Sequence, residues 1–555
     1  MQNIVCKNSD MSTLLNDEIE NMRENDVINR IWNRDYTLWS DSPAEISNRL
    51  DWLNIVDEMM TKTDEIIKFS EKVCHNYNFL VLLGMGGSSL APEVFSKIFG
   101  SKEGYPQLFV IDTTHPEQIM DVQNAIELDK TLFITSTKSG GTVETISLMK
   151  YFYTLLTNTY SKEKAGEQFI AITDPGSGLE DMAKELGFSK IFLNNPDIGG
   201  RFSALSMFGL VPAALLGINI DLLLERTKAA MELSKLGGDD TLHNVSAELG
   251  VLMGVMAKNN LNKMTVLTHD DYIPIGAWIE QLVAESTGKI GKGVLPVVDD
   301  TIENMEHFSD DRYYVLIEKS DEISGNADLL CKRGKTTFQL NFTDLYDLGA
   351  HFFYWEFATA VAGWSLKLQP FDQPDVESAK VQARAMVKTF IDTGNLPEVN
   401  PDYEDDEVKI LGEGVNGNNI STITDDFITS ATNKKDSPYI SVQAYVNMNE
   451  NNQVTLKNYA DMLLKKYQFP VTVGFGPRFL HSTGQLHKGD DNSGIFIQLI
   501  EENMDDINIP DEAGKNDSGI SFGTLITAQS LGDRQALINN DRSVLRIIFK
   551  SKMNL

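Results

Sequence analysis

Short apolar runs alternate with helix-length segments over much of the chain. Five such runs fall between residues 75 and 195, and Gly, Ser, Thr, Asp or Pro follows most of them. Continuous apolar runs of this length are typical of parallel strands that helices cover on both faces of a sheet. The predicted strands are FLVLL (79–83), LFVI (108–111), LFIT (132–135), FIAIT (169–173) and KIFLN (190–194).

A second series of strands and helices follows. Residues 201–257 are predicted to be mostly helical, and residues 344–366 to form one long, mostly buried helix. A further helix is predicted over about 456–467. Further strand-like runs occupy 264–268, 293–298, 313–318, 439–446, 471–475 and 494–500.

This alternation predicts an α/β protein with two doubly wound parallel-sheet domains and helical arms, because right-handed crossovers between parallel strands produce that architecture. We expect an N-terminal helical arm over 1–60, a first domain over 61–240 and a second over 241–555. Within the second, residues 391–437 are acidic and then rich in Gly and Asn. Such a composition is typical of an inserted surface loop or a mobile lid.

Composition narrows the classes of function. The chain has 555 residues, of which 42% are hydrophobic and 23% charged, as in ordinary globular proteins. The formal net charge of −32 favours a solvated acidic surface and argues against nucleic acid as a partner, because a nucleic-acid binder needs a basic footprint. A locally positive pocket for a small anion remains compatible with this charge.

The cysteines and apolar segments indicate a cytoplasmic protein without a membrane anchor. Cys6, Cys74 and Cys331 are far apart and offer neither metal-ligand spacing nor a disulfide framework, so no metal is expected. The N-terminus has no secretory signal pattern. The longest strongly apolar stretch, Phe208–Ile218, is too short to span a bilayer.

Two loops carry the features of an anion site. Gly84–Pro92 (GMGGSSLAP) directly follows a predicted strand and opens a helix, where glycines and free N–H groups receive an anion. A dinucleotide is the rival ligand. Ser89 stands where G-x-G-x-x-G/A has its third glycine, but Asp112 would suit a ribose. A tight turn without a ligand is the third interpretation.

The second loop, Ser136–Thr145 (STKSGGTVET), favours a phosphate monoester. Ser139, Thr142 and Thr145 are three residues apart and lie near one another on a helical first turn. Hydroxyls and backbone amides together suit a phosphate group, and the nucleotide P-loop pattern is absent. A capping loop rich in hydroxyls is the alternative.

Two further motifs carry candidate catalytic groups. Gly199–Ser203 (GGRFS) places Arg201 behind two glycines, and a fixed guanidinium can stabilise a developing oxyanion. Gln281 and Glu285 are four residues apart, on one face of a predicted helix. A carboxylate among apolar residues can serve as a base near neutral pH. Taken alone, these patterns are better explained by a surface arginine and a solvated glutamate.

The order of five motifs resembles one family. GMGGSSLAP, STKSGGTVET, GGRFS, EQLVAESTGK and FDQPDVESAK (Phe371–Lys380) are similar, in that order, to segments of glucose-6-phosphate isomerases, which contain two sugar-isomerase (SIS-type) domains. The resemblance covers roughly residues 30–555. WNRDYTLW and FGPRFLHSTGQLHKG look most like the isomerase half of transaldolase/glucose-6-phosphate isomerase fusion proteins. No transaldolase barrel is expected here.

The resemblance implies an enzyme that interconverts glucose 6-phosphate and fructose 6-phosphate in glycolysis and gluconeogenesis, without metal or organic cofactor. It opens the sugar ring and moves a proton between C2 and C1 through a cis-enediol(ate). By similarity, Glu285 is the base, Arg201 stabilises the enediolate and Lys380 assists ring opening. The substrate-binding residues implied are Gly87, Ser88, Thr137, Lys138, Ser139, Thr142, Thr145, Gln281 and Gln373.

The ring-opening histidine departs from the family pattern. Most members carry it in a Gly-Gln-His segment between the catalytic glutamate and FDQ, and it reaches the site from the partner subunit. Here no such segment lies between Glu285 and Phe371. The nearest counterparts are His481 and His487 after FDQ, and Gly484-Gln485 favours His487. The resemblance thus implies a homodimer.

Two other functions stay open at this point. A non-catalytic SIS-type sugar-phosphate sensor would keep the phosphate loop, but it would not need Glu285, Arg201 and Lys380 together. A nicotinamide-dependent oxidoreductase would use the Gly84 loop, but it would have no use for the Ser136–Thr145 loop.

Overall fold

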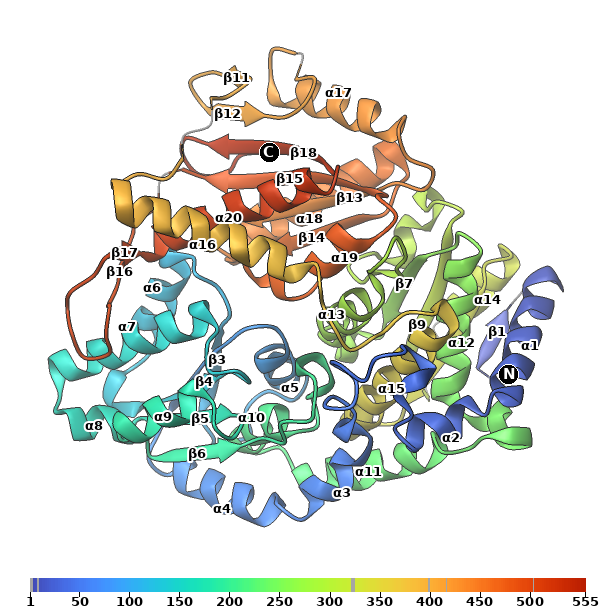
Figure 1. The fold of residues 1–555 in the computed structure, drawn as a ribbon, viewed down its shortest axis with the longest axis horizontal. Helices are drawn as coiled ribbons and strands as arrows, with labels where there is room; N and C mark the ends of the chain where they lie inside the picture. Colours follow the sequence, from blue (N-terminus) through green and yellow to red (C-terminus); the bar gives the residue numbers. More distant parts are fainter. Residues whose placement is uncertain (1–2, 7–8, 321–324, 398–399, 416, 503) are drawn as a thin grey trace.

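A computed structural model describes residues 1–555 except 1–2, 7–8, 321–324, 398–399, 416 and 503. The described chain forms three large sheets and one two-stranded sheet, and the three large sheets surround a common centre, as Figure 1 shows. The predicted fold class, α/β with parallel sheets, is confirmed. The strands of the predicted second domain, 241–555, are divided between two separate sheets, a division that the apolar pattern did not reveal.

The first sheet contains all five strands predicted before residue 195. Its order is β3-β2-β4-β5-β6, and all its neighbours are parallel. The chain leaves β2 for β3 and returns to the other side of β2 as β4, so the two loops that follow β2 and β4 flank a switch point, where α/β sheets bind ligands. Its elements are β2 (Phe79–Gly84), α5 (Leu90–Phe99), β3 (Gln107–Ile111), α6 (Pro116–Ala125), β4 (Thr131–Ser136), α7 (Val143–Thr159), α8 (Lys162–Glu167), β5 (Phe169–Thr173), α9 (Gly178–Glu185) and β6 (Lys190–Leu193).

The second sheet has the order β1-β10-β9-β7-β8, in which β1 is antiparallel and the other strands are parallel. Its helix α13 connects β7 to β8 and carries both Gln281 and Glu285. The elements are β1 (Ile4–Cys6), α12 (Val245–Lys258), β7 (Lys263–Thr268), α13 (Ile275–Thr287), β8 (Leu295–Val297), β9 (Arg312–Lys319), α14 (Asn326–Lys332), β10 (Thr337–Phe342) and α15 (Leu348–Leu366).

The third sheet has the order β11-β12-β18-β15-β13-β14, and β18, β15, β13 and β14 are parallel. Helix α16 packs against α20 between this sheet and the first one (Figure 1). The elements are α16 (Val376–Thr393), β11 (Tyr403–Glu404), β12 (Val408–Leu411), α17 (Ile420–Thr432), β13 (Tyr439–Tyr445), α18 (Glu450–Tyr467), β14 (Val471–Phe475), α19 (Gly484–Gly489), β15 (Gly494–Glu501), the hairpin β16 (Asn508–Ile509) and β17 (Ile520–Ser521), α20 (Phe522–Asn539) and β18 (Ser543–Phe549).

The predicted insertion over 391–437 contains regular elements in its described part, namely β11, β12 and α17. Strand β12 pairs antiparallel with β18, so this segment extends the third sheet. At the end of its Gly- and Asn-rich run, Asn419 caps the first turn of α17 by accepting a hydrogen bond from the Thr422 N–H. Turn and cap residues therefore produced the loop-like composition.

The N-terminal helices complete the main core. Trp32 and Trp52 pack on Phe353 and Phe357 of α15, and α15 is buried over almost its whole length. No helix of the described chain combines the length and apolarity that a membrane crossing requires. The remaining helices are α1 (Ser9–Glu24), α2 (Val27–Trp32), α3 (Ile55–Met60), α4 (Thr63–Cys74), α10 (Met207–Leu215) and α11 (Ile220–Leu233).

Helices α12 and α15 approach closely at Gly250. A Cβ added there would lie 2.5 Å from the Ala358 carbonyl oxygen and 2.5 Å from Val361 Cβ. We expect Gly250→Ala to lower the free energy of unfolding by about 1–3 kcal/mol, because the helices must move apart. Chemical denaturation measures this. Gly178→Ala is the control, since its added Cβ meets nothing closer than 3.5 Å; equal stability of the two variants would contradict the packing argument.

Candidate active site

The two predicted phosphate loops lie side by side at the switch point of the first sheet. The Ser136 hydroxyl donates to the Ser88 carbonyl at 3.0 Å, which ties the loops together. Gly86 has φ +57°, a conformation that favours glycine. A Cβ on Gly87 would overlap the backbone of Gly200, so the Gly84 loop and the GGRFS loop are in direct contact.

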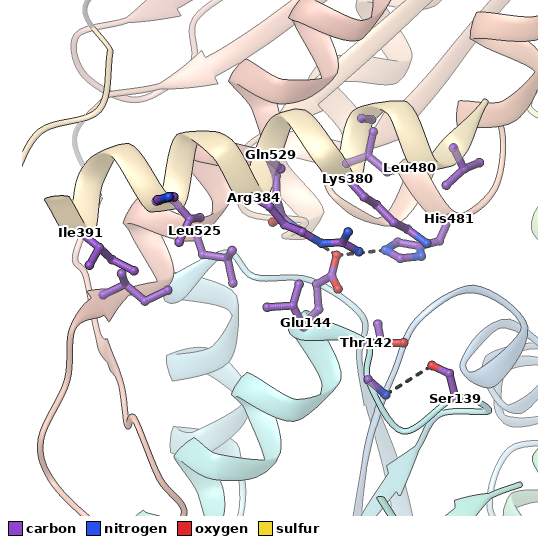
Figure 2. A pocket seen from close by; sticks show the side chains of 18 of the residues that line it. Ser139, Thr142, Glu144, Lys380, Arg384, Ile391, Leu480, His481, Leu525 and Gln529 are labelled. Carbon is purple, nitrogen blue, oxygen red and sulfur yellow. Dashed lines mark hydrogen bonds and ion pairs between the residues drawn. The ribbon is translucent and has the colours of Figure 1, made fainter. Parts of the chain in front are cut away.

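The side chains of the Ser136–Thr145 loop have different surroundings. Ser139 and Thr142 line a cavity of about 510 Å³, which Figure 2 shows. Thr137 is buried and shares a hydrogen bond with Thr142 at 3.0 Å. Thr145 is fully buried in α7. Lys138 pairs with Asp174 and donates to the Pro196 carbonyl at 2.7 Å, so its ammonium is already occupied.

Arg201 is buried beside Glu285. Its Nη1 lies 3.4 Å from Glu285 Oε1 and donates to Gln373 Oε1 at 3.0 Å. Its Nε donates to Ser286 Oγ at 2.7 Å, and Nη2 donates to the Pro370 and Asp372 carbonyls. Burial lowers the pKa of Arg201, an effect that the neighbouring carboxylates oppose. These contacts hold the guanidinium in one orientation.

Lys289 is a second buried cation, and it contacts residues 369–373, which Arg201 also contacts. Lys289 donates to the Gln369 carbonyl at 2.8 Å and to Asp372 Oδ1 at 2.6 Å. Burial and the nearby Arg201 lower the pKa of Lys289 to about 7, although Asp372 opposes this. Arg201 and Lys289 therefore fix residues 369–373, which carry Gln373.

Helix α13 connects the Arg201–Glu285 pair to the third sheet. As predicted from their spacing, Gln281 and Glu285 share one face of the helix, with Gln281 Nε2 3.3 Å from Glu285 Oε2. The same Nε2 donates to the His481 carbonyl at 2.7 Å. Gly86 also lies against this point, since an added Cβ would be 2.8 Å from Gln281 Nε2.

His481 reaches the site from the third sheet. It ends a short helical turn, Arg478–His481, that follows β14. Its Nε2 lies 3.0 Å from Glu144 Oε1, at the start of α7 (Figure 2). Burial opposes ionisation of Glu144, but His481 and also Lys380 hold its pKa below the ordinary value. Lys380 and His481 both line the cavity.

His487 does not line that cavity. The residue is 1% exposed, and its ring lies within hydrogen-bonding distance of Gln443 and Ser441 and packs 5.1 Å from the Phe496 ring. Burial, together with Lys488 and Arg542, holds the pKa of His487 well below its ordinary value. The Gly-Gln pair that favoured His487 thus precedes a core residue of the third sheet.

Three residues of the site neighbourhood were missed by the sequence analysis. Glu144 lies inside the STKSGGTVET motif. The three-residue spacing in that motif indicated its hydroxyl residues and not Glu144. Arg478 pairs with Glu93 and with Asp112, and the latter contact is 3.2 Å. Gln529 of α20 contacts Glu144 and carries no local signal. Because Asp112 is buried and paired with Arg478, its carboxylate is not free for a ribose.

Comparison with known proteins shows the family of the chain. The sequence profile described as phosphoglucose isomerase matches residues 9–301. The chain belongs to the phosphoglucose isomerase family. It is 27% identical over 398 residues to the glucose-6-phosphate isomerase of Staphylococcus aureus (strain NCTC 8325 / PS 47), covering 61% of this chain and 87% of that protein. The protein is accordingly an isomerase enzyme that acts on sugar phosphates.

Solved structures share the fold. A hypothetical protein, TT0462, from Thermus thermophilus aligns with a TM-score of 0.59 and 22% identity, over 68% of this chain and 98% of that one. A glucose-6-phosphate isomerase from Chlamydia trachomatis D/UW-3/Cx aligns with a TM-score of 0.51 and 19% identity, over 65% of this chain and 78% of that one. The family match ends at residue 301, so Gln373, Lys380 and His481 lie beyond it.

A second cavity, of about 530 Å³, lies on the far side of the Arg478–His481 turn. Glu280 lines it, one residue before Gln281. Burial, with a contribution from Asp299, raises the pKa of Glu280 to about 8, while Arg478 opposes this. Burial likewise raises the pKa of Asp299 to about 6. The Glu280 carboxyl therefore keeps its proton at neutral pH.

We expect Glu280→Gln to stabilise the protein at pH 8 but not at pH 4.5. Between these values the unfolded chain ionises at Glu280 while the folded chain retains the proton, so stability conferred by this site falls as pH rises. The gain at pH 8 should be at least about 1 kcal/mol, the value of one pKa unit. Thermal unfolding at both pH values measures it, with the exposed Glu225→Gln as a control for loss of charge. A gain that does not grow with pH would contradict the assignment.

Proposed function

We propose that the protein interconverts glucose 6-phosphate and fructose 6-phosphate, a reaction of glycolysis and gluconeogenesis. The observation that carries the proposal is the continuous set of contacts Arg201–Glu285–Gln281–His481–Glu144, next to a loop rich in hydroxyls. A proton-transferring carboxylate, a fixed cation and an acid for ring opening are thereby within reach of one small sugar phosphate.

The phosphate binds between the two loops of the first sheet. Ser139 and Thr142 supply hydroxyls, and the N-terminus of the 17-residue helix α7 supplies free N–H groups and a positive dipole. Gly87 and Ser88 of the neighbouring loop complete the phosphate site. Thr137 acts through its hydrogen bond with Thr142, and Thr145 is buried in α7 behind the loop. Since Lys138 is held by Asp174, it acts on the loop rather than on the phosphate in this conformation.

His481 opens the ring. Glu144 only accepts hydrogen bonds when ionised, so His481 Nε2 must carry a hydrogen, and Nδ1 exchanges the proton. The imidazolium gives a proton to the ring oxygen, the bond from that oxygen to the anomeric carbon breaks, and the anomeric hydroxyl loses its proton to water as the carbonyl forms. Lys380 lies at the cavity wall near Glu144 and assists this step.

Glu285 then transfers a proton between carbons. In the direction from fructose 6-phosphate it removes a proton from C1, which leaves a cis-enediolate, and it returns the proton to C2. The positive charge of Arg201 stabilises the enediolate oxygens. Gln281 orients the carboxylate of Glu285, and Gln373 reaches the same region from residues 369–373.

The rival functions fit these contacts less well. A sugar-phosphate sensor has no need of a buried Arg201–Glu285 pair or of a histidine paired with Glu144. A nicotinamide-dependent oxidoreductase would need the Asp112 carboxylate, which Arg478 occupies. A homodimer and a cytoplasmic location remain predictions.

Glu285→Gln should lower kcat at least about 10²-fold with little change in substrate affinity, because it removes the base but keeps the side-chain shape. Fructose 6-phosphate turnover is followed by a coupled dehydrogenase assay of glucose 6-phosphate, in chelator-treated buffer. Glu280→Gln, on the same helix but facing the second cavity, should retain wild-type turnover. A kcat near that of wild type for Glu285→Gln would remove this residue from the role of base.

His481 should act on the Glu285 of its own chain, because it contacts Glu144, Gln281 and Gly86 of that chain. Mixed oligomers of Glu285→Gln and His481→Ala chains should therefore be inactive, since every site lacks one group. If the histidine instead came from a partner subunit, the heterodimer that carries both tags would have one intact site of two and about half of wild-type activity. Co-expression with two different tags and purification through both measures this.

A further inference from the structure

Gln529 connects the third sheet to the Glu144–His481 pair. It lies on α20, is 4% exposed, and its Nε2 donates to Glu144 Oε1 at 2.7 Å. Figure 2 shows Gln529 and His481 approaching Glu144 from α20 and from the turn after β14. The same carboxylate oxygen therefore accepts hydrogen bonds from two residues of the C-terminal region.

Thr114 sets the orientation of the Gln529 amide. The Thr114 hydroxyl, just after β3, is fully buried and donates to Gln529 Oε1 at 2.7 Å. An amide turned by 180° would place its oxygen against the Glu144 carboxylate, which only accepts. The two hydrogen bonds therefore run from Thr114 to Gln529 and from Gln529 to Glu144, as both the distances and the donor and acceptor types require.

This order has a consequence for His481. Since the Gln529 N–H holds the carboxylate oxygen from one side, that oxygen keeps a constant position toward His481 Nε2, 3.0 Å away. Hydrogen bonds to the charged form also favour ionised Glu144, which keeps the hydrogen on Nε2 and leaves Nδ1 to exchange the proton. Loss of the Gln529 contact would let the carboxylate and the imidazole move together.

We propose that Gln529 and Thr114 are positioning residues for ring opening, acting through Glu144 and His481. This role rests on the proposed isomerase function and adds to it two residues outside the sequence motifs. It also connects the third sheet to one step of the reaction. Ring opening depends on helix α20, whereas the transfer of a proton between carbons does not.

The test separates the two steps with an open-chain substrate. Fructose 6-phosphate must be opened before Glu285 acts, whereas 5-deoxyfructose 6-phosphate lacks the ring oxygen and is always open. We expect Gln529→Leu to lower kcat for fructose 6-phosphate about tenfold or more, within the range of acid–base catalysis. Exchange of the C1 hydrogen of 5-deoxyfructose 6-phosphate with solvent deuterium, followed by NMR, should remain within about twofold of wild type on the same scale.

Matched variants exclude a general loss of structure. Gln535→Leu makes the same change on the same helix at a half-buried position, where the side chain hydrogen-bonds to Asn539 and not to the site, and should leave both reactions unchanged. Thr114→Val should repeat the Gln529→Leu effect in smaller measure, and Thr114→Ser should restore turnover of fructose 6-phosphate.

Two outcomes would overturn the positioning role. Equal losses with both substrates, or a raised KM for both, would make Gln529 a structural or substrate-contacting residue. Unchanged turnover of fructose 6-phosphate would leave it without a role in ring opening. Failure of the proposed function is distinct, since wild-type enzyme would then turn over neither substrate.

Discussion

The buried guanidinium of Arg201 joins the parts of the chain on which the site depends. A fully desolvated cation is costly unless several acceptors compensate it, and here Ser286, Gln373, two backbone carbonyls and Glu285 do so. These partners come from α13 and from residues 369–373. Each of them is therefore held in place by the requirement to satisfy one charge, and the phosphate loop at Gly87 lies directly against the same backbone turn.

The third sheet positions His481, which the contacts of Arg201 do not reach. Its turn after β14 is clamped on one side by Arg478, which pairs with Glu93 and Asp112 of the first sheet. On the other side, the buried Lys488–Asp533 pair at 2.6 Å holds α19 against α20. His481 lies between the two anchors, so its distance from Glu144 depends on the ion pairs of Arg478 and Lys488.

The sequence predicts part of this fold and site, and the physical reasons for that success also explain what it does not predict. The first-sheet strands were predictable because strands buried on both faces form continuous apolar runs, and the spacing of Gln281 and Glu285 gave their shared helix face. The separation of 241–555 into two sheets was not, since an apolar run does not specify which strand it pairs with. Gly484-Gln485 favoured His487 over His481, and the sequence did not reveal that His487 is buried under the third sheet while His481 lines the cavity. Gln529 lies in an ordinary helix, where its partners 385 and 415 residues away leave no local pattern.

The contact between Glu144 and His481 spans 337 positions of sequence, and this separation governs when the site can exist. Domains fold largely as units while a chain is being synthesised, at about 5–20 residues per second. The first sheet can thus form with its phosphate loops complete while the turn that carries the imidazole is still unmade. The contact between Glu144 and His481, and with it the complete site, can form only when the last sheet docks, roughly tens of seconds after the first sheet is made.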